Sequence, residues 1–175
     1  MKLALCGVHG SGKTTLLNKI QELNLLPGYY YSTNLTRRLR DQGYLISDKG
    51  DDATQNAIMS VHRANMAYTD IIMDRSALDC YVYTEYLYRQ DKVSGLTSQK
   101  LFSQAMDCVN RYNIMFYIKP EFELEDDGVR PIDQKFQNDI VETFDRIITL
   151  CRLRVTLLTG TVDQRIEQFK QTLGI

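Results

Sequence analysis

The sequence lacks the features that mark secreted, zinc-binding and broadly nucleic-acid-binding proteins. Its four cysteines, Cys6, Cys80, Cys108 and Cys151, lie far apart, with no C-x-x-C pair and no Cys/His cluster at metal-ligand spacing. We therefore expect buried free thiols in a reducing cytoplasm, and no zinc site. The formal net charge is −1, with both signs spread along the chain. A nucleic-acid partner is therefore not expected, although a local basic groove stays open.

The chain also has few structure breakers and no long apolar run. It contains three prolines and no Pro/Gly/Ser-rich linker, internal repeat or low-complexity segment. The N-terminus leads into a strand pattern rather than a signal peptide, and no apolar run could cross a bilayer. We therefore expect one cytoplasmic domain over residues 1–175, with room for one good hydrophobic core and no membrane partner.

The most specific feature is a glycine-rich stretch, GVHGSGKT, that begins at Gly7. It matches G-x-x-x-x-G-K-[ST] at every fixed position. The glycines let the backbone approach an anion closely, and the helix that starts near Lys13 adds the partial positive charge of its N-terminus. Lys13 would reach the β- and γ-phosphates of ATP, and the Thr14 hydroxyl would bind Mg²⁺. We interpret His9, at a variable position, as a tolerated residue rather than a catalyst. The predicted nucleotide contacts are Gly7, Gly10, Ser11, Gly12, Lys13, Thr14 and Thr15.

Short apolar runs alternate with helical patterns along the whole chain. The pattern predicts strands at 2–6, 29–31, 71–73, 114–118 and 155–158, and helices at 13–22, 33–42, 53–68, 77–90, 97–111, 132–152 and 162–173. This alternation is typical of an α/β fold: a three-layer α/β/α sandwich around a mostly parallel five-stranded sheet that carries the P-loop. In such sheets the ligand crevice lies beyond the carboxyl ends of the strands.

Polar residues follow the third predicted strand, where that crevice is expected. Asp74 can meet the Mg²⁺ shell held by Thr14, and Arg75 would face the transferring or accepting phosphate. The alternative is a helix N-cap, because Asp and Ser are common at helix starts, and Ser76 fits that role. We predict Asp74 as a metal ligand, and Asp74 and Arg75 as catalytic residues beside Lys13.

Two further connections at strand ends are candidate nucleotide contacts. The segment 120–131 is long for a compact α/β domain and suits a lid, whose far end would bring Arg130 onto the β- and γ-phosphates as a catalytic residue. A solvated acidic loop balanced by Arg130 is the alternative. After the last strand, the turn at Gly160 could lie against the adenine through backbone groups, or be a plain loop.

Arginines after the second predicted strand suit an anionic acceptor. Arg37 and Arg40 are three residues apart and share one helix face. Gln55 and Arg63, on the next helical stretch, could contact a base or grip a phosphate. Solvated surface side chains are the alternative reading of these arginines. Together with Arg75, these four residues form the predicted substrate-binding set.

These motifs together resemble the P-loop nucleoside and nucleotide kinases. GVHGSGKTT is similar to their phosphate loop, MDRSALDCYVY to the Asp-Arg strand end of thymidylate-kinase-like and deoxynucleoside-kinase-like enzymes, and STNLTRRLRDQG to their substrate-side Thr-Arg segment. DDGVRPIDQKFQNDI resembles the lid-to-helix segment of small kinase-like ATPases often found in phage genomes. The residues to which the resemblance assigns a role are Lys13, Thr14, Arg37, Asp74, Arg75 and Arg130. The chain has TNLT where thymidylate kinases usually show Glu-Pro-Gly-Gly, which argues against thymidylate as the acceptor.

The expected activity is Mg²⁺-dependent transfer of the γ-phosphate of ATP to a small-molecule acceptor. A nucleoside hydroxyl benefits from a carboxylate base, whereas a nucleoside monophosphate is already an anion and needs arginines to offset charge repulsion. The available arginines favour a (deoxy)nucleoside monophosphate, with a (deoxy)nucleoside as the alternative. A polynucleotide 5′-kinase and an ATP-hydrolysing switch are further alternatives. Whether the chain forms a homodimer stays open.

Overall fold

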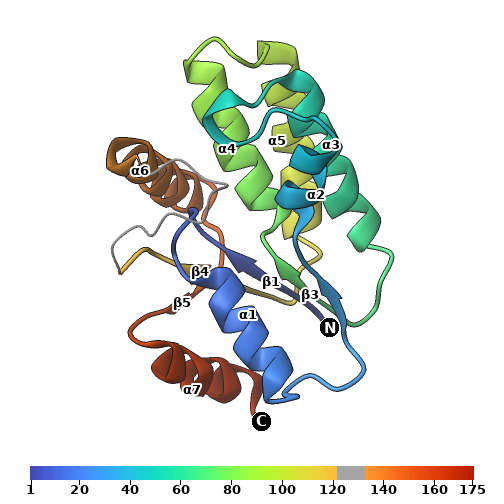
Figure 1. The fold of residues 1–175 in the computed structure, drawn as a ribbon, viewed down its shortest axis with the longest axis vertical. Helices are drawn as coiled ribbons and strands as arrows, with labels where there is room; N and C mark the ends of the chain where they lie inside the picture. The colour runs from blue at the N-terminus through green and yellow to red at the C-terminus, as the bar shows by residue number, and fades with distance from the viewer. Residues whose placement is uncertain (122–132) are drawn as a thin grey trace.

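Five strands form the central sheet in a computed structural model of the chain, which describes residues 1–121 and 133–175 (Figure 1). Their spatial order is β2-β3-β1-β4-β5, and every pairing is parallel. The strands are β1 (Lys2–Cys6), β2 (Tyr30–Ser32), β3 (Ile71–Asp74), β4 (Ile114–Ile118) and β5 (Thr156–Leu158). The predicted five-stranded α/β sheet is confirmed, and the described strands are parallel throughout rather than mostly parallel.

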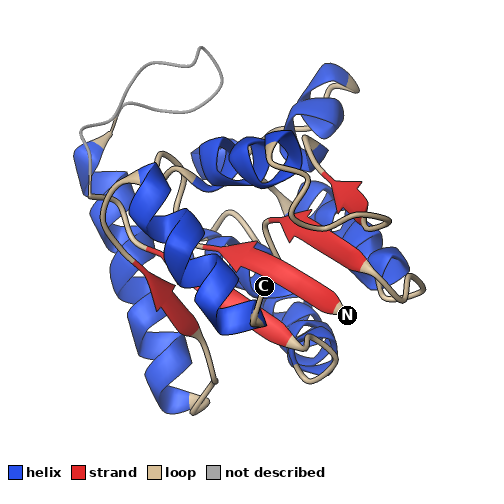
Figure 2. Cartoon of the chain, turned by 90° about the horizontal axis from the view of Figure 1, so that it is seen from below, coloured by secondary structure: helices blue, strands red, loops and turns tan. Residues whose placement is uncertain are grey.

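Helices cover both faces of this sheet, as Figure 2 shows. They are α1 (Lys13–Glu22), α2 (Leu35–Asp41), α3 (Asp52–Asn65), α4 (Ala77–Arg89), α5 (Gly95–Val109), α6 (Gln134–Leu150) and α7 (Val162–Leu173), with a 3₁₀ turn η1 (Ser47–Lys49) before α3. One face carries α1 and α7, and the other carries α3 to α6, which gives the predicted three layers (Figure 1). In the described parts of the chain, no helix has the length and apolar character needed to cross a membrane.

The middle strand β1 supplies both halves of the core because successive side chains point to opposite faces. Leu3 and Leu5 pack in one apolar cluster with α1 and α7, and Ala4 and Cys6 pack in a second cluster under the other helices. All four side chains are fully buried. A strand buried on both faces reads as a continuous apolar run, which is what the sequence shows here. Cys80 and Cys108 are also buried free thiols, as expected, whereas Cys151 is only partly buried.

Element boundaries differ from the sequence prediction by one to three residues where a cap decides them. The helix expected from residue 33 begins at Leu35, after Asn34 in a left-handed conformation (φ 58°). The helix expected from residue 97 begins at Gly95, because the Ser94 side chain accepts from the Thr97 backbone N–H. The η1 turn was not expected. The predicted start of α6 at residue 132 lies outside the described residues.

The topology brings distant segments to one edge of the sheet. Leu5 of β1 pairs with Asp74 of β3 on one side and with Phe116 of β4 on the other. The loop after β1, the Asp-Arg segment after β3 and the connection after β4 therefore leave the sheet side by side. This edge is the ligand crevice that a parallel sheet offers.

Candidate functional site

The loop between β1 and α1 takes a conformation that requires glycine. Gly7 has φ 140°, and a Cβ placed on it would lie 2.2 Å from the Ile118 carbonyl oxygen. Gly10 and Gly12 also have positive φ values, of 72° and 89°. No described side chain caps the first turn of α1, which begins directly after Gly12. The amides of that turn are thus available to an anion, as in helix-N-terminal phosphate sites.

Lys13 lies inside the loop rather than on the surface. Its side chain is buried, and Nζ donates to the Val8 carbonyl oxygen at 2.5 Å and to Ser11 Oγ at 3.0 Å. These contacts fold the ammonium back onto the loop, where a bound phosphate would take over its hydrogen bonds. Thr15 follows in the first turn of α1, and its side chain is exposed. The geometry fits the phosphate role predicted for Lys13, and the role itself stays a prediction.

Thr14 and Asp74 form the best candidate for a magnesium site. The Thr14 hydroxyl donates to Asp74 Oδ2 at 2.7 Å, across 60 residues of sequence. A hydroxyl and a carboxylate are hard oxygen ligands of the kind Mg²⁺ prefers, and Mg²⁺ usually completes its shell with water and phosphate oxygens. The donor set therefore fits Mg²⁺ bound together with a nucleotide. Within residues 1–121 and 133–175, no group of three or more His, Cys, Asp or Glu side chains could hold a metal ion on its own.

Arg75 turns out of the sheet at the end of β3 through a left-handed backbone conformation, with φ 85°. Its backbone N–H donates to the Leu5 carbonyl oxygen at 3.0 Å, which keeps the turn against β1. The guanidinium lies 5.3 Å from the centre of the Tyr83 ring, and Nη1 lies 3.7 Å from Asp79 Oδ1. Burial alone would lower the pKa of Arg75, but Tyr83, Asp79 and Asp74 raise it, so the side chain stays charged.

Asp79 links the start of α4 to the glycine-rich loop, a role that sequence reasoning missed. Its Oδ2 accepts from the backbone N–H and hydroxyl of Ser76 at 2.9 and 2.7 Å, and its Oδ1 accepts from the Gly7 N–H at 3.1 Å. Ser76 is the N-cap of α4, in a capping box with Asp79. The expected N-cap role of Ser76 is confirmed. The S-x-x-D spacing was the signal for Asp79.

His9 is built into the loop rather than merely tolerated there. Its Nδ1 lies 2.9 Å from the Tyr83 hydroxyl, which also accepts the His9 backbone N–H at 3.1 Å. The imidazole stacks on Phe136 with ring centroids 5.0 Å apart, and Gln137 Nε2 donates to the His9 carbonyl oxygen at 3.0 Å. His9 thus joins the loop to α4 and α6. Tyr83 contacts both His9 and Arg75, so it connects the loop with the candidate acceptor side.

A second support reaches the loop from α7. Arg165 is almost fully buried, and its Nη1 donates to the Ser11 carbonyl oxygen at 2.7 Å. Its Nη2 lies 3.4 Å from Glu121 Oε2, the same oxygen that accepts the Gly160 N–H at 2.6 Å. Arg165 and Glu121 thereby connect the glycine-rich loop, the start of the long connection after β4 and the turn after β5. No local pattern in the sequence indicates this role of Arg165.

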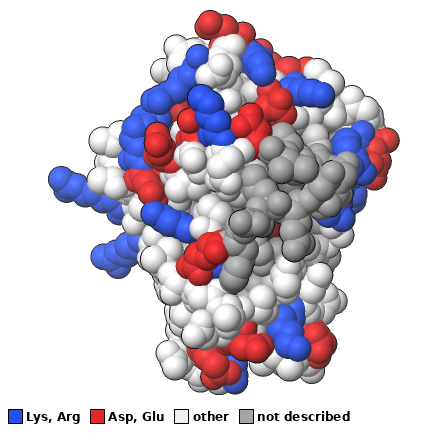
Figure 3. All heavy atoms as spheres, turned by 60° about the vertical axis from the view of Figure 1, so that its left-hand side comes forward, with Lys and Arg blue, Asp and Glu red and all other residues white. Residues whose placement is uncertain are grey.

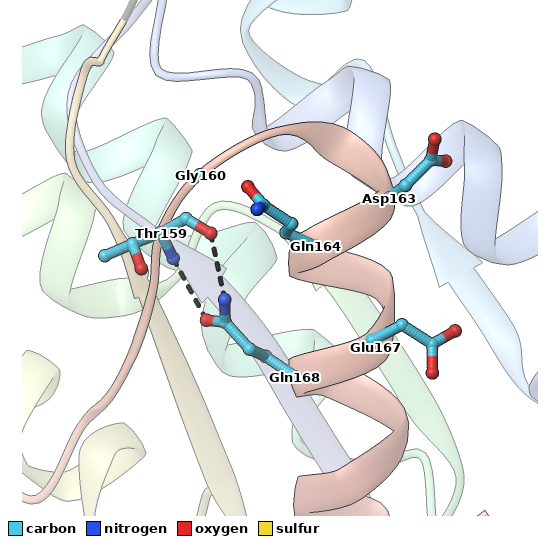
Figure 4. A pocket seen from close by; sticks show the side chains of 6 residues that line it. All are labelled: Thr159, Gly160, Asp163, Gln164, Glu167 and Gln168. Carbon is cyan, nitrogen blue, oxygen red and sulfur yellow. Dashed lines mark hydrogen bonds between the residues drawn. The ribbon is translucent and has the colours of Figure 1, made fainter.

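The turn at Gly160 borders a surface hollow, shown in Figure 4. Gln168 holds this turn by donating to the Thr159 carbonyl oxygen at 2.9 Å and accepting the Thr159 N–H at 3.1 Å. The predicted adenine contact of Gly160 stays a prediction, and its own N–H is engaged by Glu121. The hollow is lined by Thr159, Gly160, Asp163, Gln164, Glu167 and Gln168.

Two adjoining pockets lie on the other side of the loop. The front pocket is lined by Thr14, Asn34, Leu35, Thr36, Arg37, Asp74 and Arg75. The inner pocket is lined by Thr36, Ser47, Gln55, Ile58, His62, Arg75, Asp79, Cys80 and Tyr83. They share Thr36 and Arg75 and therefore adjoin each other.

The predicted substrate-binding residues are only partly brought together. Arg37 lines the front pocket, Gln55 the inner pocket, and Arg75 both. Arg40 is exposed and pairs with Asp41 at 2.9 Å, away from both linings. Arg63 is also exposed and is absent from both linings, because it lies one residue beyond His62 on α3 and faces outward. Arg130 and most of the predicted lid lie outside the described residues.

Charges of both signs lie on the face of the molecule that Figure 3 presents. Figure 3 shows Lys and Arg side chains interspersed with Asp and Glu on the face that it presents. This matches the formal net charge of −1 and differs from the continuous basic face typical of nucleic-acid-binding proteins.

Comparisons with known proteins agree with this geometry. Residues 2–165 match the AAA domain family. Among solved structures, deoxyadenosine kinase from M. mycoides has a TM-score of 0.70 and 16% identity, covering 99% of this chain and 98% of that one. NadR protein has a TM-score of 0.74 and 18% identity, covering 99% of this chain and 51% of that one. YorR protein from Bacillus subtilis has a TM-score of 0.58 and 12% identity. No curated protein sequence matches the chain. At these identities the solved structures show the fold alone, which this chain shares with the deoxyadenosine kinase and with NadR protein.

Proposed function

The chain belongs to the AAA domain family, and on that premise we propose that it is an ATP-dependent phosphotransferase with a P-loop kinase mechanism. It moves the γ-phosphate of ATP, with Mg²⁺, to a (deoxy)nucleoside monophosphate. The observation that carries the proposal is the front pocket, where Arg37 and Arg75 lie beside Thr14 and Asp74. Two arginines next to a candidate magnesium site suit an acceptor and a donor that are both anionic.

The carboxylates of the pockets support a monophosphate rather than a hydroxyl acceptor. Among the described residues that line either pocket, only Asp74 and Asp79 carry carboxylates. Asp74 accepts the Thr14 hydroxyl and would be a metal ligand, and Asp79 already accepts from Gly7 and Ser76. Neither is left over to take a proton from a nucleoside hydroxyl. A monophosphate needs no base at neutral pH, so the arginines suffice.

The proposed catalysis is positioning together with charge neutralisation. Lys13 and the amides after Gly7 bind the β- and γ-phosphates of the donor. Tyr83 and Asp79 hold the Arg75 guanidinium in place. Because the side chain is already positioned, it can bridge the donor and acceptor phosphates with little loss of conformational entropy. Mg²⁺ bound at Thr14 and Asp74 would neutralise charge on the donor phosphates. The lid role of Arg130 stays a prediction.

A (deoxy)nucleoside is the second candidate acceptor. The likeness to deoxyadenosine kinase supports it at the level of fold. In that case Asp74 would have to serve as the base for the hydroxyl instead of, or in addition to, binding the metal. The two candidate acceptors therefore differ in the role of Asp74, which is a metal ligand for a monophosphate acceptor and must act as a base for a nucleoside acceptor.

Transfer from ATP to a panel of acceptors tests the proposal. The panel contains the (deoxy)nucleosides, their 5′-monophosphates and 5′-hydroxyl oligonucleotides, and an acceptor-free reaction measures simple hydrolysis. We expect phosphorylation of at least one monophosphate, little turnover without acceptor, and loss of activity in Lys13→Ala. Lys19→Ala is the matched control, because Lys19 lies on the same helix and pairs with Glu22 on the surface. An ATP hydrolysis rate that is the same with and without every acceptor would favour a switch ATPase and refute the transferase.

A further inference from the structure

His62 is a buried polar side chain without a hydrogen-bond partner in the described part of the chain. It is only 2% exposed, and neither Nδ1 nor Nε2 has a partner among residues 1–121 and 133–175. A buried polar group that is left unpaired costs about 1–3 kcal/mol, so such groups are rare in folded proteins. A bound ligand that forms hydrogen bonds with the two unpaired ring nitrogens would remove this cost.

The position of His62 supports this explanation. It comes from α3 and lines the inner pocket, opposite side chains of α4. Gln55, two turns earlier on α3, lines the same pocket and is 1% exposed. The Gln55 side-chain oxygen Oε1 accepts a hydrogen bond from Thr84 Oγ1 at 3.1 Å. The amide nitrogen Nε2 is therefore left to donate to a ligand in the pocket. The inner pocket thus carries neutral groups that both donate and accept hydrogen bonds.

The charge state of His62 also suits an uncharged ligand. Burial, and then the nearby charge of Arg75, lower the pKa of His62 to about 3. The imidazole is therefore neutral at physiological pH, with one N–H donor and one nitrogen acceptor. Arg37 lines the front pocket alone, whereas Arg75 lines both pockets and lies 3.7 Å from Asp79, the carboxylate of the inner pocket. An acceptor with an anionic end and an uncharged polar end would match this division.

We propose that His62 is a specificity-determining residue that exchanges hydrogen bonds with the polar edge of the acceptor's nucleobase in the inner pocket. The inference rests on the proposed function, because it takes the acceptor to be a nucleoside or its monophosphate. The phosphate or 5′ end lies in the front pocket beside Arg37 and Arg75, and the base reaches past Thr36 toward α3. The inner pocket, of about 30 Å³ in this structure, widens around the base as it enters. The exocyclic amino or carbonyl group at purine C6 or pyrimidine C4 pairs with the imidazole, and a base without that group loses this hydrogen bond.

Paired changes in enzyme and substrate test this proposal. Each natural monophosphate is compared with an analogue that lacks the exocyclic group at purine C6 or pyrimidine C4: the purine deoxyriboside monophosphate for purines, and the 2-pyrimidinone deoxyriboside monophosphate, which keeps only its C2 carbonyl, for pyrimidines. In the wild-type protein we expect the best natural acceptor to exceed its analogue in kcat/KM by about 10-fold or more, since the analogue leaves a buried group unpaired. In His62→Met we expect the ratio to fall to within about threefold, through a higher KM for the natural acceptor and an unchanged KM for ATP.

Two further variants separate recognition from packing. His62→Gln restores a donor and an acceptor and should recover part of the selectivity. Met59→Leu changes a fully buried side chain on the same helix that is not among the residues lining the inner pocket, and it should leave the selectivity unchanged. Selectivity that survives intact in His62→Met would overturn the inference while leaving the transferase standing.

Calorimetric binding of the same nucleosides and monophosphates, without ATP, separates failure of the inference from failure of the proposed function. Binding that weakens in His62→Met but yields no phosphoryl transfer in the wild-type protein would refute the kinase and support the role of His62. Absence of any binding would overturn both. If the variants do not fold, ¹⁵N spectra of the wild-type imidazole decide: His62 signals should shift on saturation with the acceptor, and unchanged signals contradict the contact.

Discussion

The buried neutral state of His62 makes a quantitative prediction about stability and pH. In the unfolded chain its pKa is near the ordinary value of 6.5, and in the folded protein it is lowered to about 3. Below pH 6.5 the unfolded state therefore binds a proton that the folded state does not. Stability from this group is fully present above about pH 6.5 and is lost progressively as pH falls toward 3.

The size of the effect follows from the gap between these values. Each pH unit below the unfolded pKa costs about 1.4 kcal/mol, so about pH 5 should cost roughly 2 kcal/mol of unfolding free energy from His62 alone. Other groups facing the inner pocket also titrate: burial raises the pKa of Asp79, although Arg75, Lys13 and Ser76 oppose that rise, and burial raises the pKa of Cys80. These groups remain in a His62 variant, so the difference between the two proteins isolates the imidazole.

Urea unfolding of the wild-type protein and of His62→Gln, each at about pH 7.5 and about pH 5, measures this difference. We expect the wild-type protein to lose roughly 2 kcal/mol more than the variant on acidification. His9 is the only other histidine in the chain and is unchanged in both proteins. Equal losses in the two proteins would show that His62 titrates normally, and the account of a neutral, desolvated imidazole would be wrong.

Three further substitutions test the rest of the site. Arg37→Ala should raise the acceptor KM by about 10-fold or more with little change in the ATP KM, because a charge-assisted contact is lost; an equal rise in both would reject its place on the acceptor side. Asp74→Asn should raise the Mg²⁺ concentration for half-maximal activity by about 10-fold, measured by Mg²⁺ titration, since one charged ligand becomes neutral. An unchanged titration would remove Asp74 from the metal site. Tyr83→Phe should cost about 1–3 kcal/mol in urea unfolding, because the His9 N–H loses its buried acceptor, and a neutral result would mean that water replaces the hydroxyl.

The order of elements and the phosphate loop were predictable because their signals are local. Eight contiguous residues from Gly7 specify the loop, and alternating strand and helix patterns specify the parallel sheet. Boundaries were less predictable because they depend on caps. The left-handed Asn34 and the Ser94 cap moved two helix starts by two residues each. The placement of Asp74 at the site also followed from the rule that ligands bind beyond strand ends.

Which of the predicted substrate-binding side chains reach a pocket could not be decided from the sequence, because helix phase and packing determine it. Arg37 and Arg40 share a spacing, yet Arg40 pairs with Asp41 on the surface. Arg63 was chosen from α3, whereas the structure brings its neighbour His62 into the inner pocket. A lone histidine on a helix carries no local sign of burial or of an unpaired ring, so sequence reasoning had no means to prefer it.

The sequence by itself determined the nucleotide-binding loop, the parallel layers around it and the edge at which a ligand must bind, because these follow from short-range backbone preferences and side-chain periodicity. Tertiary structure alone decided how that loop is supported and which side chains line the two adjoining pockets. The contact between Arg165 and Ser11 spans 154 residues, and the bond between Tyr83 and His9 spans 74. Such contacts depend on the packing of elements that are distant in the chain, which no local pattern encodes.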